Sequence, residues 1–250
     1  MGTRHTLSHA DALYHGNSQM GSRYDANRGI PFNPVTFVDL GAPVTLDADA
    51  FVVAATSTEL PNAATITYTF PGVASPIDGA EADGVIATPR NVTAAVTHAS
   101  AVVAMTLLVT GKDENEVVMS ELLTIAAGGT SQAATGKKAF KKLTSIAITS
   151  AGDATTNTLN MGFGDTLGLP FLLSQKNAVL YLMDGIPQVT GTITPGDTTS
   201  PATTTTGDVR GTILPATATN GTRRYGAWMT GVPVADRNDS ANSAYGVAQT

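Results

Sequence analysis

The segment Pro89–Thr149 constrains the fold of this chain more than any other. Its runs of β-branched and apolar residues are separated by turn-forming residues, and they cover Asn91–Thr97, Val102–Thr110, Glu116–Ile125 and Ala139–Thr149. Such a pattern is typical of packed antiparallel strands. No nucleophile motif, metal-ligand cluster or phosphate loop interrupts these runs. We therefore expect an all-β scaffold that acts through its surfaces.

Composition narrows the class of protein further. The chain has 250 residues, enough for one large β-domain or two small ones. It has no cysteine, which excludes disulfides, thiolate catalysis and cysteine-based zinc sites. Only 14% of its residues are charged, whereas an average soluble domain has about 25%. This low charge is typical of virion or extracellular proteins whose surface is largely covered by neighbouring proteins. An ordinary secreted β-domain would also fit.

Charge and hydropathy also bear on partners and location. The formal net charge of −6 argues against general nucleic-acid binding, which normally requires a basic face. The first sixteen residues lack the apolar core of a secretory signal. No apolar run reaches the roughly 18 residues of a membrane span. We expect a protein made in the cytoplasm, with neither a nucleic-acid nor a membrane partner.

Residues 1–34 differ from the rest and are predicted to form an N-terminal arm. They are rich in His, Arg, Asn, Ser and Gly, with few adjacent apolar positions. Ser8–His15 carries weak helix start and stop signals. Pro31 and Pro34 prevent helix formation and end the arm. An arm without its own core needs a surface, either of its own domain or of a neighbour.

Residues 35–232 are predicted to form a β-sandwich or jelly-roll-like body of about a dozen short strands. Hairpin turns are expected at Lys112–Asn115 and Asp184–Gly185, and a third at Asn220–Gly221 that joins GDVRGTILP to GTRRYGAWMTG. The glycines of LNMGFGDTLG indicate positive φ or close backbone approach.

The sequence also indicates loops, a possible division of the body and a C-terminal tail. Composition predicts loops at 71–84, at 126–136 and through the Thr/Pro-rich segment PGDTTSPATTTTG. A division of the body near Ala151–Asn157 stays open. Residues 233–250 have no apolar period and are expected to be an exposed or disordered tail.

Several of these segments resemble, in order, a family of tailed-bacteriophage virion structural proteins. The segments are TPRNVTAAV, VTGKDENEVVMSELLTI, TGKKAFKKLTSIAI, GFGDTLGLP and GDVRGTILPATATNGTRRYGAWMTG, which together span about Thr88–Gly231. The resemblance implies a non-enzymatic capsid decoration, or cement, protein on the outer surface of the virion. It implies the major capsid protein and further copies of the chain, as a homotrimer, as partners. It carries no catalytic residue or cofactor, and it does not include the arm.

Candidate chemical sites are weak in this sequence. His5, His9 and His15 with Asp11 offer metal-ligand side chains, but more often such histidines are exposed or lie at interfaces. His98 is isolated in a strand and is expected to be a satisfied packing residue. Acidic groups that suggest paired catalytic carboxylates or calcium ligands are expected to be solvating charges; they are Asp47, Asp49, Asp78, Glu81 and Asp83. We therefore predict no catalytic, metal or cofactor site.

Interface candidates fall into two groups. Arginine and aromatic side chains anchor interfaces, and in the arm they are Arg4, Arg23, Tyr24, Arg28 and Phe32. The second group is the lysine cluster, expected at an exposed strand end, of Lys137, Lys138, Lys141 and Lys142. Arg223 and Arg224 are a further basic pair.

An alternative function is a tail or fibre protein with a carbohydrate-binding β-sandwich for host attachment. Tyr225 and Trp228 then form part of a sugar platform, although aromatic residues in strands more often pack. A hydrolase is a third reading, and it requires one of the acidic pairs to be catalytic.

Overall fold

The computed structural model describes residues 23–25, 30–32, 35–72, 76–175, 179–230 and 243–249. Within these ranges the chain is almost entirely β, with one short 3-10 helix, η2 (Ser57–Glu59), and no α-helix. No described helix has the length and apolar content needed to cross a bilayer. The strands are β1 (Arg23–Asp25), β2 (Ile30–Phe32), β3 (Val35–Gly41), β4 (Asp47–Ala55), β5 (Thr65–Thr69), β6 (Val85–Thr97), β7 (Met105–Lys112), β8 (Val118–Ile125), β9 (Ser131–Ser150), β10 (Thr158–Gly168), β11 (Val179–Met183), β12 (Ile186–Pro187), β13 (Gly191–Pro195), β14 (Gly211–Pro215), β15 (Tyr225–Thr230), β16 (Ser243–Ala244) and β17 (Val247–Ala248).

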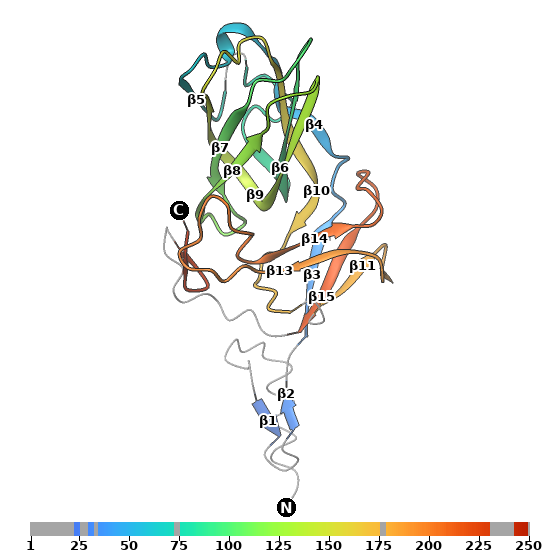
Figure 1. Ribbon diagram of the computed structural model, residues 1–250. Helices are drawn as coiled ribbons and strands as arrows, with labels where there is room; N and C mark the ends of the chain where they lie inside the picture. The colour runs from blue at the N-terminus through green and yellow to red at the C-terminus, as the bar shows by residue number, and fades with distance from the viewer. Residues whose placement is uncertain are drawn as a thin grey trace, which may run out of the picture.

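Two large antiparallel sheets form the body, which confirms the predicted β-sandwich. The nine-stranded sheet has the order β13-β14-β10-β6-β9-β7-β8, with β4 paired to β10 and β5 paired to β9. The four-stranded sheet has the order β12-β11-β15-β3. Figure 1 shows the four-stranded sheet below the bulk of the larger sheet, with β10 extending between them.

The first hydrophobic core lies inside the larger sheet, which folds over itself. Strand β9 has 20 residues; its first half pairs with β6, and its second half lies between β5 and β7. The first core therefore contains side chains from strands that pair with either half of β9 and from their neighbours. Its fully buried residues include Phe51, Val92, Leu107, Ile146 and Met161.

The second core lies between the four-stranded sheet and the ends of β10 and β14. Leu167 and Ile213 contribute from the larger sheet, while Val38, Tyr181 and Tyr225 contribute from the smaller one. The rings of Tyr181 and Tyr225 stack with centroids 6.2 Å apart. Residues 151–157 belong to the β9–β10 connection, and Ala154 is fully buried in the first core.

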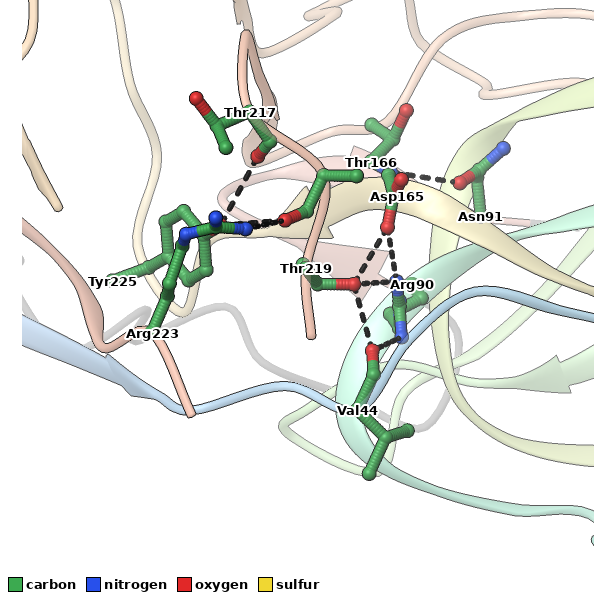
Figure 2. A network of polar contacts seen from close by, with 10 residues as sticks. Val44, Arg90, Asn91, Asp165, Thr166, Thr217, Thr219, Arg223 and Tyr225 are labelled. Carbon is green, nitrogen blue, oxygen red and sulfur yellow. Dashed lines mark hydrogen bonds and ion pairs between the residues drawn. The ribbon is translucent and has the colours of Figure 1, made fainter. Parts of the chain in front are cut away.

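A buried polar cluster joins the region of the first core to that of the second (Figure 2). The Arg90 guanidinium, on β6, donates to the Val44 carbonyl, to Asp165 Oδ1 and to Thr219 Oγ1, each at 2.7 Å. The same guanidinium lies 4.8 Å from the centre of the Phe163 ring. Burial lowers the pKa of Arg90, and the carboxylate of Asp165 opposes this shift. Loops that flank the four-stranded sheet are thereby tied to β6 and β10.

Local turn predictions are mostly confirmed. Residues 113–117 connect the hairpin of β7 and β8. Asp184 and Gly185 have φ of +52° and +77° and connect β11 to β12, as an Asp-Gly hairpin turn requires. At Asn220 the turn is also formed, since its Oδ1 accepts the N–H groups of Thr222 and Arg223.

Two expectations about strand pairing and extent are wrong. Strand β14 pairs with β13 and β10, whereas β15 pairs with β11 and β3, so the Asn220 turn links two sheets and not two strands of a hairpin. The loop expected at 126–136 is shorter, because β9 already begins at Ser131. Pairing of Ser131–Thr135 with β6 extends the strand through this Ala- and Thr-containing segment.

The expected exposed tail is also wrong for residues 243–249. These residues form the β16–β17 hairpin, and Val247 packs against Ala202 and Val209. The Tyr245 ring lies 5.6 Å from the Arg210 guanidinium, which is itself in a buried ion pair with Asp113. Residues 231–242 and 250 lie outside the described part of the chain.

The predicted arm is described at two short strands only. Strands β1 and β2 pair with each other as a separate two-stranded sheet, and Figure 1 places them beyond the end of the body. The helix expected at Ser8–His15 lies outside the described residues.

Candidate functional site

Three large apolar side chains form an exposed stripe on the outer face of the four-stranded sheet. Leu180, Trp228 and Phe37 are direct cross-strand neighbours on β11, β15 and β3. Their exposed fractions are 47%, 42% and 47%. The Phe37 and Trp228 ring centroids are 4.9 Å apart, with the rings tilted by 49°. We call these three residues the apolar stripe.

Strand alternation explains why the stripe faces outward. The residues next in sequence, Tyr181, Ala227 and Val38, point to the opposite face and fill the second core. Gly226 lies beneath the Phe37 ring, where a Cβ atom would come within 2.8 Å of it. Only glycine at this position therefore lets the ring lie against the sheet.

An open depression of about 450 Å³ adjoins the stripe. Its lining includes Phe37, Leu182, Asp39, Asp184 and Arg224. The Arg224 guanidinium forms an ion pair with Asp39, and its backbone N–H donates to Asp184 Oδ1 at 2.8 Å. The Gly41 N–H and the Arg224 charge lower the pKa of Asp39. Such an exposed pair contributes at most about 1 kcal/mol to stability, so its charges remain available to a ligand.

The predicted lysine cluster does not form one exposed patch. Lys138 is only 1% exposed, and its Nζ donates to the Ser120 and Thr203 carbonyls at 2.9 and 3.0 Å. Its assignment as an interface residue is therefore wrong. The lysines lie in the middle of β9, and a bulge spans residues 136–138 opposite β6.

The other three lysines occupy different surroundings. Lys137 is exposed, whereas Lys142 is half-buried. Lys141 Nζ donates to the Ala87 carbonyl at 2.7 Å and lies 3.5 Å from Glu114 Oε2. Lys137 is therefore the most accessible member of the predicted cluster.

The arm candidates are only partly placed. Arg4 and Arg28 lie outside the described residues. The β1–β2 register sets Arg23 opposite Phe32 and Tyr24 opposite Pro31. The hairpin backbone therefore brings an arginine and an aromatic residue of the predicted interface together.

Histidine and acidic candidates have local roles where they are described. His98 Nδ1 accepts the N–H groups of Ser100 and Ala101, both at 2.9 Å, which agrees with a satisfied structural histidine. Asp78 and Asp83 accept the N–H groups of Val53 and Val85. Within the described ranges no three His, Asp or Glu side chains converge as a metal site would require. The candidate ligands His5, His9, Asp11 and His15 lie outside those ranges.

Glu81 gives a pH-dependent prediction. Burial raises the pKa of its carboxyl, and the charges of Asp83 and Asp47 raise it further. A carboxyl with a raised folded-state pKa adds stability below its unfolded pKa, and this is lost as pH rises through the folded pKa. We expect Glu81→Gln to raise the melting temperature by about 1–2 °C at pH 7 and to change it less at pH 4, measured by calorimetry.

Glu116→Gln is the matched control for this prediction. The hydrogen bond and the charge of Lys112 lower the pKa of Glu116. Removal of the Glu116 carboxylate should therefore lower the melting temperature at pH 7. High salt should reduce the Glu116→Gln difference, and it should reduce the part of the Glu81→Gln difference that comes from the charges of Asp83 and Asp47, because salt screens charges. Equal melting-temperature shifts of Glu81→Gln at pH 4 and pH 7 would show that the ionised Glu81 carboxylate does not destabilise the fold.

Sequence reasoning missed the apolar stripe, although part of its signal was present. Tyr225 and Trp228 are three residues apart on one strand, so alternation places them on opposite faces. Tyr225 is buried, and its hydroxyl donates to the Thr217 and Ala218 carbonyls. The sequence could not indicate that the Trp228 face of this strand stays uncovered, because this depends on the position of the larger sheet.

The stripe and its charged depression together form a surface suited to binding. Aromatic and apolar side chains supply contact area, while Asp39, Asp184 and Arg224 supply directional polar contacts. No protein-family model matches the chain, and no curated protein or solved structure matches it either.

Proposed function

We propose that this protein is a structural component of a phage particle, a capsid decoration protein that binds the assembled major capsid protein shell. The single observation that carries the proposal is the apolar stripe on the four-stranded sheet. Contiguous exposed apolar side chains mark interaction surfaces, and Trp and other aromatic residues dominate binding energy there. The segments between Thr88 and Gly231 resemble virion structural proteins. This resemblance implies the major capsid protein as the partner.

The position of the arm supports the same proposal. The chain enters β3 at Val35, two residues before Phe37 of the stripe. Strands β1 and β2 pair only with each other among the described strands, and an isolated two-stranded hairpin is at best marginally stable in water. A partner surface would stabilise it. We propose that the arm and the stripe bind the same shell.

The proposed mechanism is stabilisation by mass action. A protein that binds the assembled shell but not its free subunits shifts the equilibrium towards the shell. Arrangement as a homotrimer would multiply the contacts of each particle with the shell through avidity. Neither step requires a catalytic residue or a cofactor.

Co-sedimentation with purified capsid shells tests the proposal. We expect deletion of residues 1–34 to abolish binding while leaving the body folded, because the described pairings of β1 and β2 do not include the body. We expect Trp228→Ala to weaken binding about 30-fold, as for an interface hot spot. Leu214→Ala, which alters a similarly exposed apolar side chain on β14, is the matched control and should bind normally.

Two results would contradict the proposal. Equal decoration by the truncated and full-length proteins would remove the arm from the mechanism. Absence of binding by the full-length protein would remove the decoration function itself.

A second candidate function is carbohydrate binding in a tail or fibre protein. The specific observation in its favour is the depression beside the stripe, where Phe37 adjoins the polar groups of Asp39, Asp184 and Arg224. Binding on a glycan array that is lost in Trp228→Ala would favour this function. A cryo-EM map also separates the two, since decoration places copies over the whole shell and attachment places a few copies at the tail.

A further inference from the structure

The Asn220–Gly221 pair carries the groups for a spontaneous covalent reaction, deamidation. Asn220 is the only asparagine in the sequence that precedes a glycine. The backbone nitrogen of such a glycine can attack the amide carbon of the preceding asparagine, because glycine has no Cβ atom to obstruct the approach. Both residues are exposed to solvent. The reacting groups and water are therefore present at one place.

The reaction proceeds in two steps and consumes only water. The Gly221 nitrogen loses its proton to solvent and bonds to Asn220 Cγ, while the side-chain nitrogen leaves as ammonia. Water then opens the resulting cyclic imide at one of its two carbonyl carbons. Opening at Cγ gives aspartate, whereas opening at the former backbone carbonyl carbon gives isoaspartate, in which the main chain runs through Cβ and Cγ. Neither step is an oxidation or a reduction.

The fold constrains both reacting groups. The Gly221 N–H donates to the Pro43 carbonyl at 2.9 Å. Asn220 Oδ1 accepts the Thr222 N–H at 3.0 Å, the Thr222 hydroxyl at 2.9 Å and the Arg223 N–H at 2.9 Å. The glycine nitrogen must lose its proton and face Cγ before the ring can close. Its hydrogen bond to Pro43 must therefore break first.

The residue before this pair belongs to the buried polar cluster of Figure 2. Thr219 is only 2% exposed, and its hydroxyl accepts a hydrogen bond from Arg90 at 2.7 Å. The same hydroxyl lies 2.7 Å from the Val44 carbonyl and 2.6 Å from Asp165 Oδ1. The turn that contains Asn220 is thus fixed on one side by the Arg90 cluster and on the other by its own hydrogen bonds. Opening of this turn requires some of these contacts to break.

We propose that Asn220 is a modification site, which the intact fold protects and which deamidates when the turn between β14 and β15 opens. Isoaspartate at this position lengthens the main chain of the turn, because Cβ is added to its path. The longer turn cannot place Thr219 against Arg90 as before. Deamidation therefore converts a transient opening into a permanent loosening of this connection between the two sheets. The inference does not depend on shell binding.

The rate of deamidation in folded and unfolded wild-type protein tests the protection. The full-length protein is incubated near neutral pH with and without urea, and Asn220 conversion is followed by mass spectrometry of its peptide. An isoaspartyl methyltransferase identifies the isoaspartate product. We expect conversion in the folded protein to be slower by about tenfold or more, because only the opened turn reacts. Absence of conversion in urea, or equal rates in both conditions, would overturn the inference.

Thr219→Val tests the role of the cluster. It removes the hydroxyl with little change of shape and should speed conversion of Asn220 in the folded protein about fivefold. Thr67→Val, at an exposed position on β5, is the matched control and should leave the rate unchanged. Equal rates in the two folded variants would show that the cluster does not control the turn. The wild-type comparison needs no variant, so it decides the protection even if Thr219→Val does not fold.

The melting temperature tests the consequence of the modification. Asn220→Asp represents the aspartate product and keeps an oxygen that can accept the Thr222 and Arg223 N–H groups. We expect isoaspartate-containing protein, separated by ion exchange after ageing, to melt at least about 2 °C below Asn220→Asp. Equal melting temperatures would show that the modification does not loosen the connection.

Discussion

Replacement of Arg90 by methionine is expected to lower the free energy of unfolding by about 3–5 kcal/mol. The guanidinium is 1% exposed, and its loss leaves the carboxylate of Asp165 largely buried without its partner. It also removes donors from the Val44 carbonyl and from Thr219. For a domain of this size the melting temperature should fall by about 6–20 °C, measurable by calorimetry or urea titration.

Two comparison variants isolate the cause. Arg224→Met removes an exposed ion pair with Asp39 and should change stability by no more than about 1 kcal/mol. The double variant Arg90→Met/Asp165→Leu removes both buried charges and should recover most of the loss, since the desolvation penalty is removed as well. If Arg90→Met were no less stable than Arg224→Met, the buried cluster would not hold the two regions together.

The second large effect is expected from Gly162→Ala, which should cost about 3 kcal/mol or more. A Cβ atom at Gly162 on β10 would lie 1.9 Å from the Asp47 carbonyl oxygen and 2.6 Å from the Ala48 carbonyl carbon. Both are backbone atoms of β4, which bulges strongly here: Met161 pairs with Val52, but Phe163 pairs with Asp47. The bulge must move away, which displaces Phe51 from the first core.

Gly152→Ala is the matched control, because its Cβ would meet nothing closer than Val103 Cγ1 at 3.4 Å. Urea unfolding of the two variants under the same conditions provides the comparison, and loss of soluble Gly162→Ala protein alone would count as the same effect. Equal stability of the two proteins would mean that β4 does not approach β10 this closely.

The β10 glycines illustrate how far sequence reasoning reaches. Their spacing predicted positive φ or close approach, and the structure has close approach at each: Gly162 to β4, Gly164 to Asn91 and Gly168 to Ala139. The sequence indicated that another part of the chain must approach these glycines closely. It could not identify the neighbours, because these come from segments far away along the chain.

The candidate site was harder to predict than the fold. The lysines of β9 were assigned to an exposed strand end, yet a bulge opposite β6 and the carboxylates of Glu121 and Asp208 enclose Lys138. A bulge depends on the register between two strands, which strand-period patterns do not encode. The apolar stripe was missed for a related reason, since alternation separates the two faces of a strand without stating which face stays uncovered.

By itself, the sequence determined the all-β class, the strand-rich segment Pro89–Thr149 and the Asp184–Gly185 turn. These features depend on side-chain period and turn chemistry, which act over a few neighbouring residues. Only the tertiary structure decided that β14 and β15 belong to different sheets, that β9 bends through the first core, and that the stripe is exposed. Those outcomes depend on pairing and burial between segments distant in the chain, where several arrangements satisfy the same local pattern.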